Sequence, residues 1–248
     1  GQAWAALGAF RPGTLLATGG YASLPLAMAA RLRGVPVVLY LPDIEPGWAV
    51  RFTAPMARRI AVTSAASKVY LPTDKIIETG YPVRDEIWGL EKAEARRRLR
   101  LQPQIPTLLV LGGSRGARSI NRAVGEGLRS LLQVCQVIHV CGPDDEPWLR
   151  ESASHLESAL ASRYALYAYL HAEFAWALAA ADLAVTRAGA SALGEFPLFG
   201  LPSILVPYPH AWRYQKVNAD YLTGRGAAVT IEDAQLSKKI ILTVNDLL

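Results

Sequence analysis

Short apolar segments alternate with helical patterns along almost the whole of the 248 residues. In the second part of the chain, strands are predicted over 107–112, 134–141, 164–170, 183–186, 203–207 and 227–231. Helical patterns separate them over 118–132, 145–160, 172–181, 190–199 and 213–223, and another begins after Leu236. Alternation of this kind is typical of βαβ units around a parallel sheet. Six such strands predict a complete doubly wound domain.

The first part of the chain repeats this pattern with fewer strands. Strands are predicted over 14–18, 35–41, 59–63 and 75–79, with helices over 21–33, 47–58 and 64–70. The chain begins inside an apparent helix, so we expect this domain to be incomplete and an N-terminal segment to be missing. The charged stretch 91–100 predicts a solvated surface helix, and Pro103 and Pro106 follow it. We therefore expect an α/β protein with two Rossmann-like doubly wound domains, residues 1–103 with the linker and residues 104–248.

Charge and cysteine usage narrow the class of protein. Hydrophobic residues make up 51% and charged residues 19%, as in folded proteins. Residues 1–103 contain 14 Lys and Arg against 8 Asp and Glu, so their net charge of +6 favours an anionic partner. Cys135 and Cys141 share one predicted strand, which holds them about 20 Å apart and prevents a bridge. Without a disulfide framework or a basic-then-apolar leader, we expect a protein of the reducing cytoplasm. No apolar run approaches the ~18 residues that span a bilayer, so we do not expect a membrane crossing.

A glycine-rich turn follows the first strand of the second domain. Residues 108–117 read as an apolar strand, then Gly112, Gly113 and Gly116, then a helix. Glycines allow close backbone approach, and the free N–H groups at a helix start favour phosphate. The turn is neither a Walker loop nor a dinucleotide fingerprint, so a purely structural turn remains an alternative.

A second turn of this kind occupies residues 186–195, again between a strand and a helix. Both turns fall at the carboxyl edge of the predicted sheet, where ligands of open α/β folds bind. Glu195 lies about one and a half turns into the helix, where it can accept hydrogen bonds from vicinal hydroxyls such as a ribose diol. The alternative for a single glutamate is an exposed helix acid.

After the strand predicted over 203–207, polar side chains stand where the other two turns have glycines. Gln215 and Asn218 carry amides that donate and accept, which suits neutral sugar hydroxyls, whereas His210 reads as a loop histidine. Residues 17–21 form another strand, glycine pair and helix start in the first domain. His139 and His155 are interpreted as structural. We find no nucleophile with a base and no metal-ligand spacing among His, Cys and acidic residues.

Taken together and in order, these segments resemble the MurG family of N-acetylglucosaminyltransferases of peptidoglycan synthesis. The matching stretches are 19–21, 34–38, 80–84, 112–117 with Asn121, 181–195 and 200–219. The resemblance implies a two-domain GT-B glycosyltransferase that inverts configuration at the sugar and needs no metal or other cofactor. It implies that the C-terminal domain holds UDP-N-acetylglucosamine (UDP-GlcNAc) and that the N-terminal domain holds an undecaprenyl-linked acceptor.

The resemblance also carries roles onto individual residues. Arg84 and Ser114 would contact the donor phosphates or nearby groups, His171 would contact the uracil through its backbone, and Gln215 would bind the sugar hydroxyls. Glu195 would bind the ribose hydroxyls. The remaining donor-side residues are Ala190, Ser191, Ala192, Leu193 and Gly194 around the nucleotide, with Gly112, Gly113 and Gly116 as the phosphate loop. The acceptor-side residues are Gly19, Gly20, Tyr21 and Asp43.

Two departures from the family pattern bear on function. The family's opening glycine-rich loop, with the histidine proposed as base, would lie upstream of residue 1, so no catalytic residue is assigned. The family's His-Glu-Gln-Asn acceptor segment reads Tyr40-Leu41-Pro42-Asp43 here. We expect transfer of N-acetylglucosamine from UDP-GlcNAc to lipid-linked muramoyl-pentapeptide. The alternatives are a UDP-sugar transferase acting on diacylglycerol and a non-catalytic UDP-sugar-binding fragment.

Basic and apolar residues mix around the helix predicted over 47–58. The residues are Trp48, Val50, Arg51, Phe52, Met56, Arg58 and Arg59. They predict either an interfacial helix that rests on anionic lipid, or a core helix that buries Trp48, Phe52 and Met56. The first interpretation places the protein at the cytoplasmic face of the plasma membrane as a peripheral protein. Nucleic acid is not expected as a partner, because the aromatic residues do not interleave with the basic ones.

Overall fold

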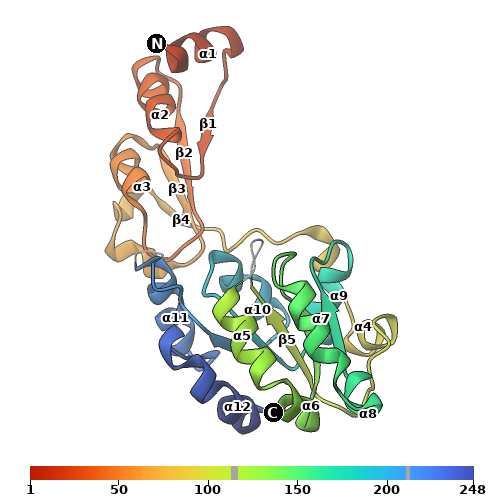
Figure 1. Cartoon of the computed structure of the whole chain (residues 1–248). Helices are drawn as coiled ribbons and strands as arrows, with labels where there is room; N and C mark the ends of the chain where they lie inside the picture. The colour runs from red at the N-terminus through yellow and green to blue at the C-terminus, as the bar shows by residue number, and fades with distance from the viewer. Residues whose placement is uncertain (113–116, 211–212) are drawn as a thin grey trace. The chain divides into compact units, whose positions relative to one another are not determined.

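The computed structural model describes residues 1–112, 117–210 and 213–248, which form two compact units, Gly1–Pro82 and Val83–Leu248 (Figure 1). Each unit has its own parallel sheet and its own apolar core. The predicted α/β class and Rossmann-like architecture are confirmed.

The sheet of the first unit has the order β1-β2-β3-β4 in the described residues, and all its strand pairs are parallel. Its strands are β1 (Leu15–Ala17), β2 (Val37–Leu41), β3 (Arg59–Val62) and β4 (Ile76–Glu78). Its helices are α1 (Gln2–Phe10), α2 (Ser23–Leu32) and α3 (Trp48–Thr53), with 3₁₀ turns η1 (Ala54–Met56), η2 (Ala65–Val69) and η3 (Thr73–Lys75). Leu39 and Ile60 are fully buried at the centre, because central parallel strands are covered on both faces.

Helix α3 distinguishes between the interfacial helix and the core helix that the sequence predicted as alternatives. It buries Ala49, Val50 and Thr53, whereas Trp48 is 51% and Phe52 62% exposed. The two exposed rings stack with their centroids 6.2 Å apart. The core-helix interpretation is therefore wrong for Trp48 and Phe52, because the small residues of the helix face the core.

The sheet of the second unit has the order β10-β9-β8-β5-β6-β7 over the part of the chain that the structure describes. Its strands are β5 (Thr107–Leu111), β6 (Gln136–Val140), β7 (Tyr164–Tyr167), β8 (Leu183–Thr186), β9 (Ser203–Leu205) and β10 (Ala228–Thr230). The chain builds outward from β5 to β7, then returns to place β8 on the other side of β5. This reversal makes a topological switch point between β5 and β8, where such folds bind ligands.

Helices cover the second sheet, and Figure 1 shows α5 and α7 beside each other in front of β5. The helices are α4 (Lys92–Arg98), α5 (Arg118–Glu126), α6 (Leu128–Val134), α7 (Glu146–Ser154), α8 (Ser158–Ala161), α9 (Glu173–Ala180), α10 (Glu195–Leu198), α11 (Tyr214–Thr223) and α12 (Leu236–Leu247). The 3₁₀ turns are η4 (Asp85–Ile87), η5 (Ala190–Leu193) and η6 (Asp233–Gln235). Leu108 and Val110 of β5 pack into the core cluster that also holds residues of α5, α6 and α12.

Three predicted helices of the second unit are interrupted in the structure. The helix predicted over 145–160 divides into α7 and α8, and a physical cause is evident for the other two. The helix predicted over 118–132 divides at Gly127, whose missing side chain leaves room for Ile241 of α12. The helix predicted over 190–199 becomes η5 followed by α10, with Pro197 in the first turn of α10. A proline is tolerated there because the first turn does not need its N–H group. These two interruptions follow from close helix packing and from proline chemistry.

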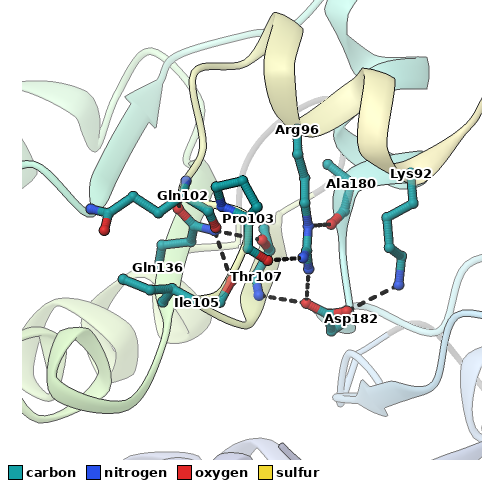
Figure 2. Close-up of polar contacts among 9 residues, drawn as sticks. All are labelled: Lys92, Arg96, Gln102, Pro103, Ile105, Thr107, Gln136, Ala180 and Asp182. Atoms are coloured by element: carbon teal, nitrogen blue, oxygen red, sulfur yellow. Dashed lines mark hydrogen bonds and ion pairs between the residues drawn. The ribbon is translucent and has the colours of Figure 1, made fainter.

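The segment before β5 is fixed to the amino edge of the second sheet (Figure 2). The Asp182 carboxylate, just before β8, accepts hydrogen bonds from Lys92 Nζ at 3.0 Å, from Arg96 and from the Thr107 N–H at 2.7 Å. Gln136 at the start of β6 donates from Nε2 to the Gln102 carbonyl at 2.9 Å and accepts from the Gln102 N–H at 3.0 Å.

These contacts explain where the compact units divide. Helix α4 packs on α9, with Ala95 buried against Ala179 and Ala180. Arg97 and Arg98 on its outer side pair with Glu94, as a solvated surface helix requires. The junction predicted near residue 103 therefore falls inside the second unit, because the stretch before it packs on that unit.

A buried polar network lies inside the second unit. The Asn121 amide of α5 donates to the Cys141 carbonyl and to Asp145 Oδ2, both at 2.7 Å, so its oxygen faces His139 Nε2 at 3.0 Å. The other imidazole nitrogen of His139 lies 2.9 Å from the Tyr164 hydroxyl. Burial lowers the pKa of His139 to about 3, although the charge of Asp145 opposes that shift. His139 is a neutral structural residue, as the sequence predicts.

Candidate functional site

A pocket of about 230 Å³ opens at the carboxyl edge of the second sheet. The ends of β5, β6 and β8 contribute Leu111, Gly112, Val140, Thr186 and Arg187. The rest of the wall comes from Arg84, Tyr169, Leu170, Phe174, Ser191, Ala192, Glu195 and Phe196. The walls are mainly apolar with a few converging polar groups, which is typical of a small-molecule site.

Glu195 is the buried acid of this pocket. It opens α10 directly after η5, and its side chain is 12% exposed. Burial raises the pKa of Glu195, while the charge of Arg84 and a hydrogen bond with Ser191 lower it in part. Such a carboxylate lacks much of its hydration and gains by accepting hydrogen bonds from a ligand.

Arg84 lies opposite this acid in the same pocket. Its Nη2 is 3.8 Å from Glu195 Oε1, and its guanidinium carbon is 5.0 Å from the ring centroid of Phe174. The side chain is 57% exposed, so it keeps donors available to solvent or to a ligand. A planar cation supported by an aromatic ring is suited to bind phosphate oxygens.

Gln215 and Asn218 lie on α11, which follows β9. The Gln215 Oε1 accepts a hydrogen bond from the Tyr208 N–H at 2.8 Å, which fixes the orientation of the amide. Asn218 is buried and donates from Nδ2 to the Ala188 carbonyl at 3.1 Å. Asn218 therefore supports the turn after β8, and its predicted suitability for sugar hydroxyls is not borne out by its position.

In the first unit, the glycine pair and Asp43 follow neighbouring parallel strands. Gly19 and Gly20 come after β1 with φ of +96° and +83°, and Asp43 comes after β2. A Cβ at Gly19 would lie 3.1 Å from Val50 Cγ2, so both the conformation and the space favour glycine. Tyr21 is 84% exposed. Because β1 pairs with β2, these residues share one edge of the first sheet.

Comparison with known proteins identifies the family. The model of the glycosyltransferase family 28 C-terminal domain matches residues 107–248, which is more than half of the chain. The chain belongs to glycosyltransferase family 28. The predicted resemblance to the MurG family and the GT-B type of fold are confirmed by the relatives and the structure that follow.

Two relatives of this family-28 chain are named UDP-N-acetylglucosamine–N-acetylmuramyl-(pentapeptide) pyrophosphoryl-undecaprenol N-acetylglucosamine transferase. The protein from Roseiflexus sp. (strain RS-1) is 45% identical over 92% of the chain, and that from Moorella thermoacetica is 39% identical over 95%. The chain spans 59% and 65% of the length of these relatives. The crystal structure of Acinetobacter baumannii MurG matches 98% of the chain and 67% of its own length, with a TM-score of 0.76 and 22% identity.

The second unit brings several of the predicted donor residues into its pocket. Arg84, Gly112, Ser191, Ala192 and Glu195 all line it. Glu195 is buried, so the alternative of an exposed helix acid is wrong. Of the other predicted donor residues, Ala190 and Leu193 belong to η5 and Gly194 joins η5 to α10.

Other predicted donor residues lie outside the pocket wall or outside the described residues. The His171 ring is exposed and lies 4.7 Å from the ring of Tyr169, which does line the pocket. Its proposed backbone contact to a uracil stays a prediction, as does the role of Gln215. Gly113, Ser114 and Gly116 lie outside the residues that the structure describes.

Several pocket residues received no role from the sequence, among them Tyr169, Phe174 and Arg187. Tyr169 and Phe174 carry no local signal, because an aromatic residue beside a helix start is usually a core residue. Arg187 lies within the stretch 181–195 that carries the resemblance to the MurG family, but it received no role.

No cluster of three His, Cys, Asp or Glu side chains within residues 1–112, 117–210 and 213–248 is arranged to hold a metal ion. None of the helices over those residues has the length and apolar character that a membrane crossing requires.

Proposed function

We propose that the second unit binds UDP-GlcNAc and that the protein transfers its N-acetylglucosamine to a lipid-linked muramoyl-pentapeptide in peptidoglycan synthesis. The observation that carries this proposal is the buried Glu195 carboxylate beside Arg84 in a pocket at the switch point. The names of the two relatives, at 45% and 39% identity, supply the sugar and the acceptor.

Within this proposal the polar groups have distinct tasks. The Glu195 carboxylate accepts hydrogen bonds from the ribose hydroxyls. Arg84 faces the diphosphate, where negative charge develops as UDP departs, so it stabilises the transition state more than the ground state. Gln215 binds the hydroxyls of the sugar. The transfer inverts configuration at the sugar and depends on these protein groups rather than on a metal.

The acceptor is proposed to bind at the carboxyl edge of the first sheet, where Gly19, Gly20 and Tyr21 lie with Asp43. Asp43 is near Tyr40, whose pKa is raised by burial and further by the Asp43 charge, against a hydrogen bond with Thr63. A carboxylate here can accept a hydrogen bond from a sugar or peptide group. The divergent segment 40–43 is the feature that keeps diacylglycerol as the alternative acceptor.

The first unit is also proposed to rest on an anionic membrane surface at the cytoplasmic face. Trp48 and Phe52 are exposed and stacked on α3, and Arg58 and Arg59 are exposed just after it. Apolar rings beside basic residues are typical of interfacial segments.

Replacing both Trp48 and Phe52 by serine should lower partitioning onto phosphatidylglycerol vesicles roughly tenfold or more, since burying each ring contributes about 1.5–3 kcal/mol. Trp88→Ser, at an exposed tryptophan of the second unit, is the control. Equal sedimentation of all variants with the vesicles would exclude this surface.

Calorimetric titration tests the donor. We expect saturable binding of UDP-GlcNAc and UDP, with UDP-glucose bound more weakly than UDP-GlcNAc because it lacks the N-acetyl group. A preference for UDP-glucose would favour the diacylglycerol alternative. Absence of binding by a folded chain, shown by circular dichroism, would contradict the proposal.

A further inference from the structure

The Arg187 guanidinium joins several segments at the carboxyl edge of the second sheet. Arg187 follows β8, and its Nη1 donates to Asp233 Oδ1 at 2.5 Å and to the Val206 carbonyl at 3.1 Å. Its Nη2 donates to Ser119 Oγ at 2.7 Å. The side chains of Arg187 and Asp233 are 13% and 24% exposed, so this ion pair is largely shielded from solvent.

Ser119 contacts both members of the Arg187–Asp233 ion pair. Its hydroxyl accepts from Arg187 and donates to Asp233 Oδ1 at 2.6 Å. Burial alone would raise the pKa of Asp233, but hydrogen bonds from Ser119 and Arg187 and the charges of Arg187 and His210 outweigh it and lower that pKa. The carboxylate is therefore ionised at neutral pH, and it compensates the charge of Arg187 next to the pocket.

A second chain of contacts leads from Arg187 toward the predicted sugar-binding residue. The guanidinium carbon lies 5.2 Å from the ring centroid of Tyr208, and the ring of His210 meets that ring edge-on. The Tyr208 N–H holds the amide oxygen of Gln215. With its oxygen fixed in this way, the Gln215 amide keeps a defined orientation, and its NH₂ group supplies the donors for a sugar hydroxyl.

We propose that Arg187, Asp233 and Ser119 are positioning residues that fix Tyr208, and through it Gln215, and so determine how strongly the site prefers the sugar-bearing nucleotide over UDP alone. This inference rests on the proposed function of the pocket. Arg187 acts here through its neighbours, because its charge is already compensated by Asp233.

The test compares UDP-GlcNAc and UDP affinities by calorimetry in the whole chain and in Asp233→Asn. The substitution keeps the shape of the side chain but removes the charge that orients Arg187. We expect the affinity for UDP-GlcNAc to fall by up to roughly tenfold, as for one neutral hydrogen bond between the Gln215 amide and a sugar hydroxyl, while the affinity for UDP stays within about twofold. Ser119→Ala should change the ratio of the two affinities in the same direction by a smaller factor, and it supplies the test if Asp233→Asn fails to fold.

Asp220→Asn is the matched control. It makes the same chemical change on α11, the helix that carries Gln215, at an exposed i,i+4 pair with Lys216. The affinity ratio should match that of the unmodified chain.

The outcomes separate the inference from the proposed function. Unchanged affinity ratios in Asp233→Asn and Ser119→Ala, with the unmodified chain binding both ligands, would overturn the inference and leave the donor site intact. Tighter binding of UDP by Asp233→Asn would also overturn it, because it would identify Arg187 as a direct phosphate ligand. Failure of the unmodified chain to bind either nucleotide would overturn the proposed function and this inference with it.

Discussion

Glu195→Gln is expected to lower the affinity for UDP roughly 10- to 150-fold. A hydrogen bond to a charged group contributes about 1.5–3 kcal/mol, and each 1.4 kcal/mol is about tenfold in affinity. The glutamine keeps the volume of the side chain but removes its charge and replaces one accepting oxygen by a donor, so the arrangement in which each oxygen accepts from one ribose hydroxyl is lost. Calorimetric titration of the variant with UDP measures the effect.

The pH dependence of binding adds a second signature. Because burial raises the pKa of Glu195 above its ordinary 4.5, the carboxylate becomes protonated at a higher pH than an exposed glutamate. UDP affinity of the unmodified chain should therefore fall as the pH is lowered through that raised pKa. The glutamine variant should lack this part of the pH dependence.

Although Glu195→Gln should weaken UDP binding, it should not lower the stability of the folded chain. A carboxyl whose pKa is raised by folding costs stability as the pH rises from its unfolded value through its folded one. Glu195→Gln removes that cost, so its melting temperature at neutral pH should be equal to or higher than that of the unmodified chain. Glu157→Gln, at an exposed acid that pairs with Arg129, is the control. Unchanged UDP affinity in a folded Glu195→Gln variant would show that Glu195 does not bind the nucleotide.

Asn121→Ala is expected to destabilise the second unit by about 3 kcal/mol or more. The substitution leaves the Nε2–H of His139, the Cys141 carbonyl and one oxygen of Asp145 without their partner inside the protein. Each unsatisfied buried group costs about 1–3 kcal/mol. Urea unfolding followed by tryptophan fluorescence measures the loss, and Trp148 is a suitable reporter because its Nε1 donates to Asp145.

The control for this network is Asn245→Ala, at an exposed asparagine of α12. It removes the same amide from the same unit and should change the free energy of unfolding by less than about 0.5 kcal/mol. A similarly small effect of Asn121→Ala would mean that the network does not hold α5 to β6.

The strands of both units were predictable because each is a short apolar run bounded by turn residues. Leu108 to Leu111 are buried on both faces of the sheet, as such a run requires. The ends of the elements were less predictable, since the helix divides at Gly127, where Ile241 from far along the chain leaves no room for a side chain. The Trp48 and Phe52 pair has the four-residue spacing of a buried stripe, yet the small residues of α3 occupy the core.

The candidate site was predictable where the chemistry is local. Glu195 belongs to the turn over 186–195, and Gly112 follows β5, so their shared sheet edge follows from the parallel pairing of β5 with β8. Phe174 was not predictable, because its ring acts as a support for Arg84 that is 90 residues away in the chain. The Arg187 and Asp233 pair, separated by 46 residues, likewise exists only once β8 and η6 are placed at the same edge.

A crystal structure of the chain with UDP-GlcNAc tests most directly whether the pocket of the second unit is the donor site. We expect the two ribose hydroxyls within hydrogen-bond distance of the Glu195 carboxylate, the diphosphate facing Arg84, and the sugar hydroxyls toward Gln215. Density for the nucleotide at another surface of the chain, or with the ribose away from Glu195, would contradict the assignment of this pocket.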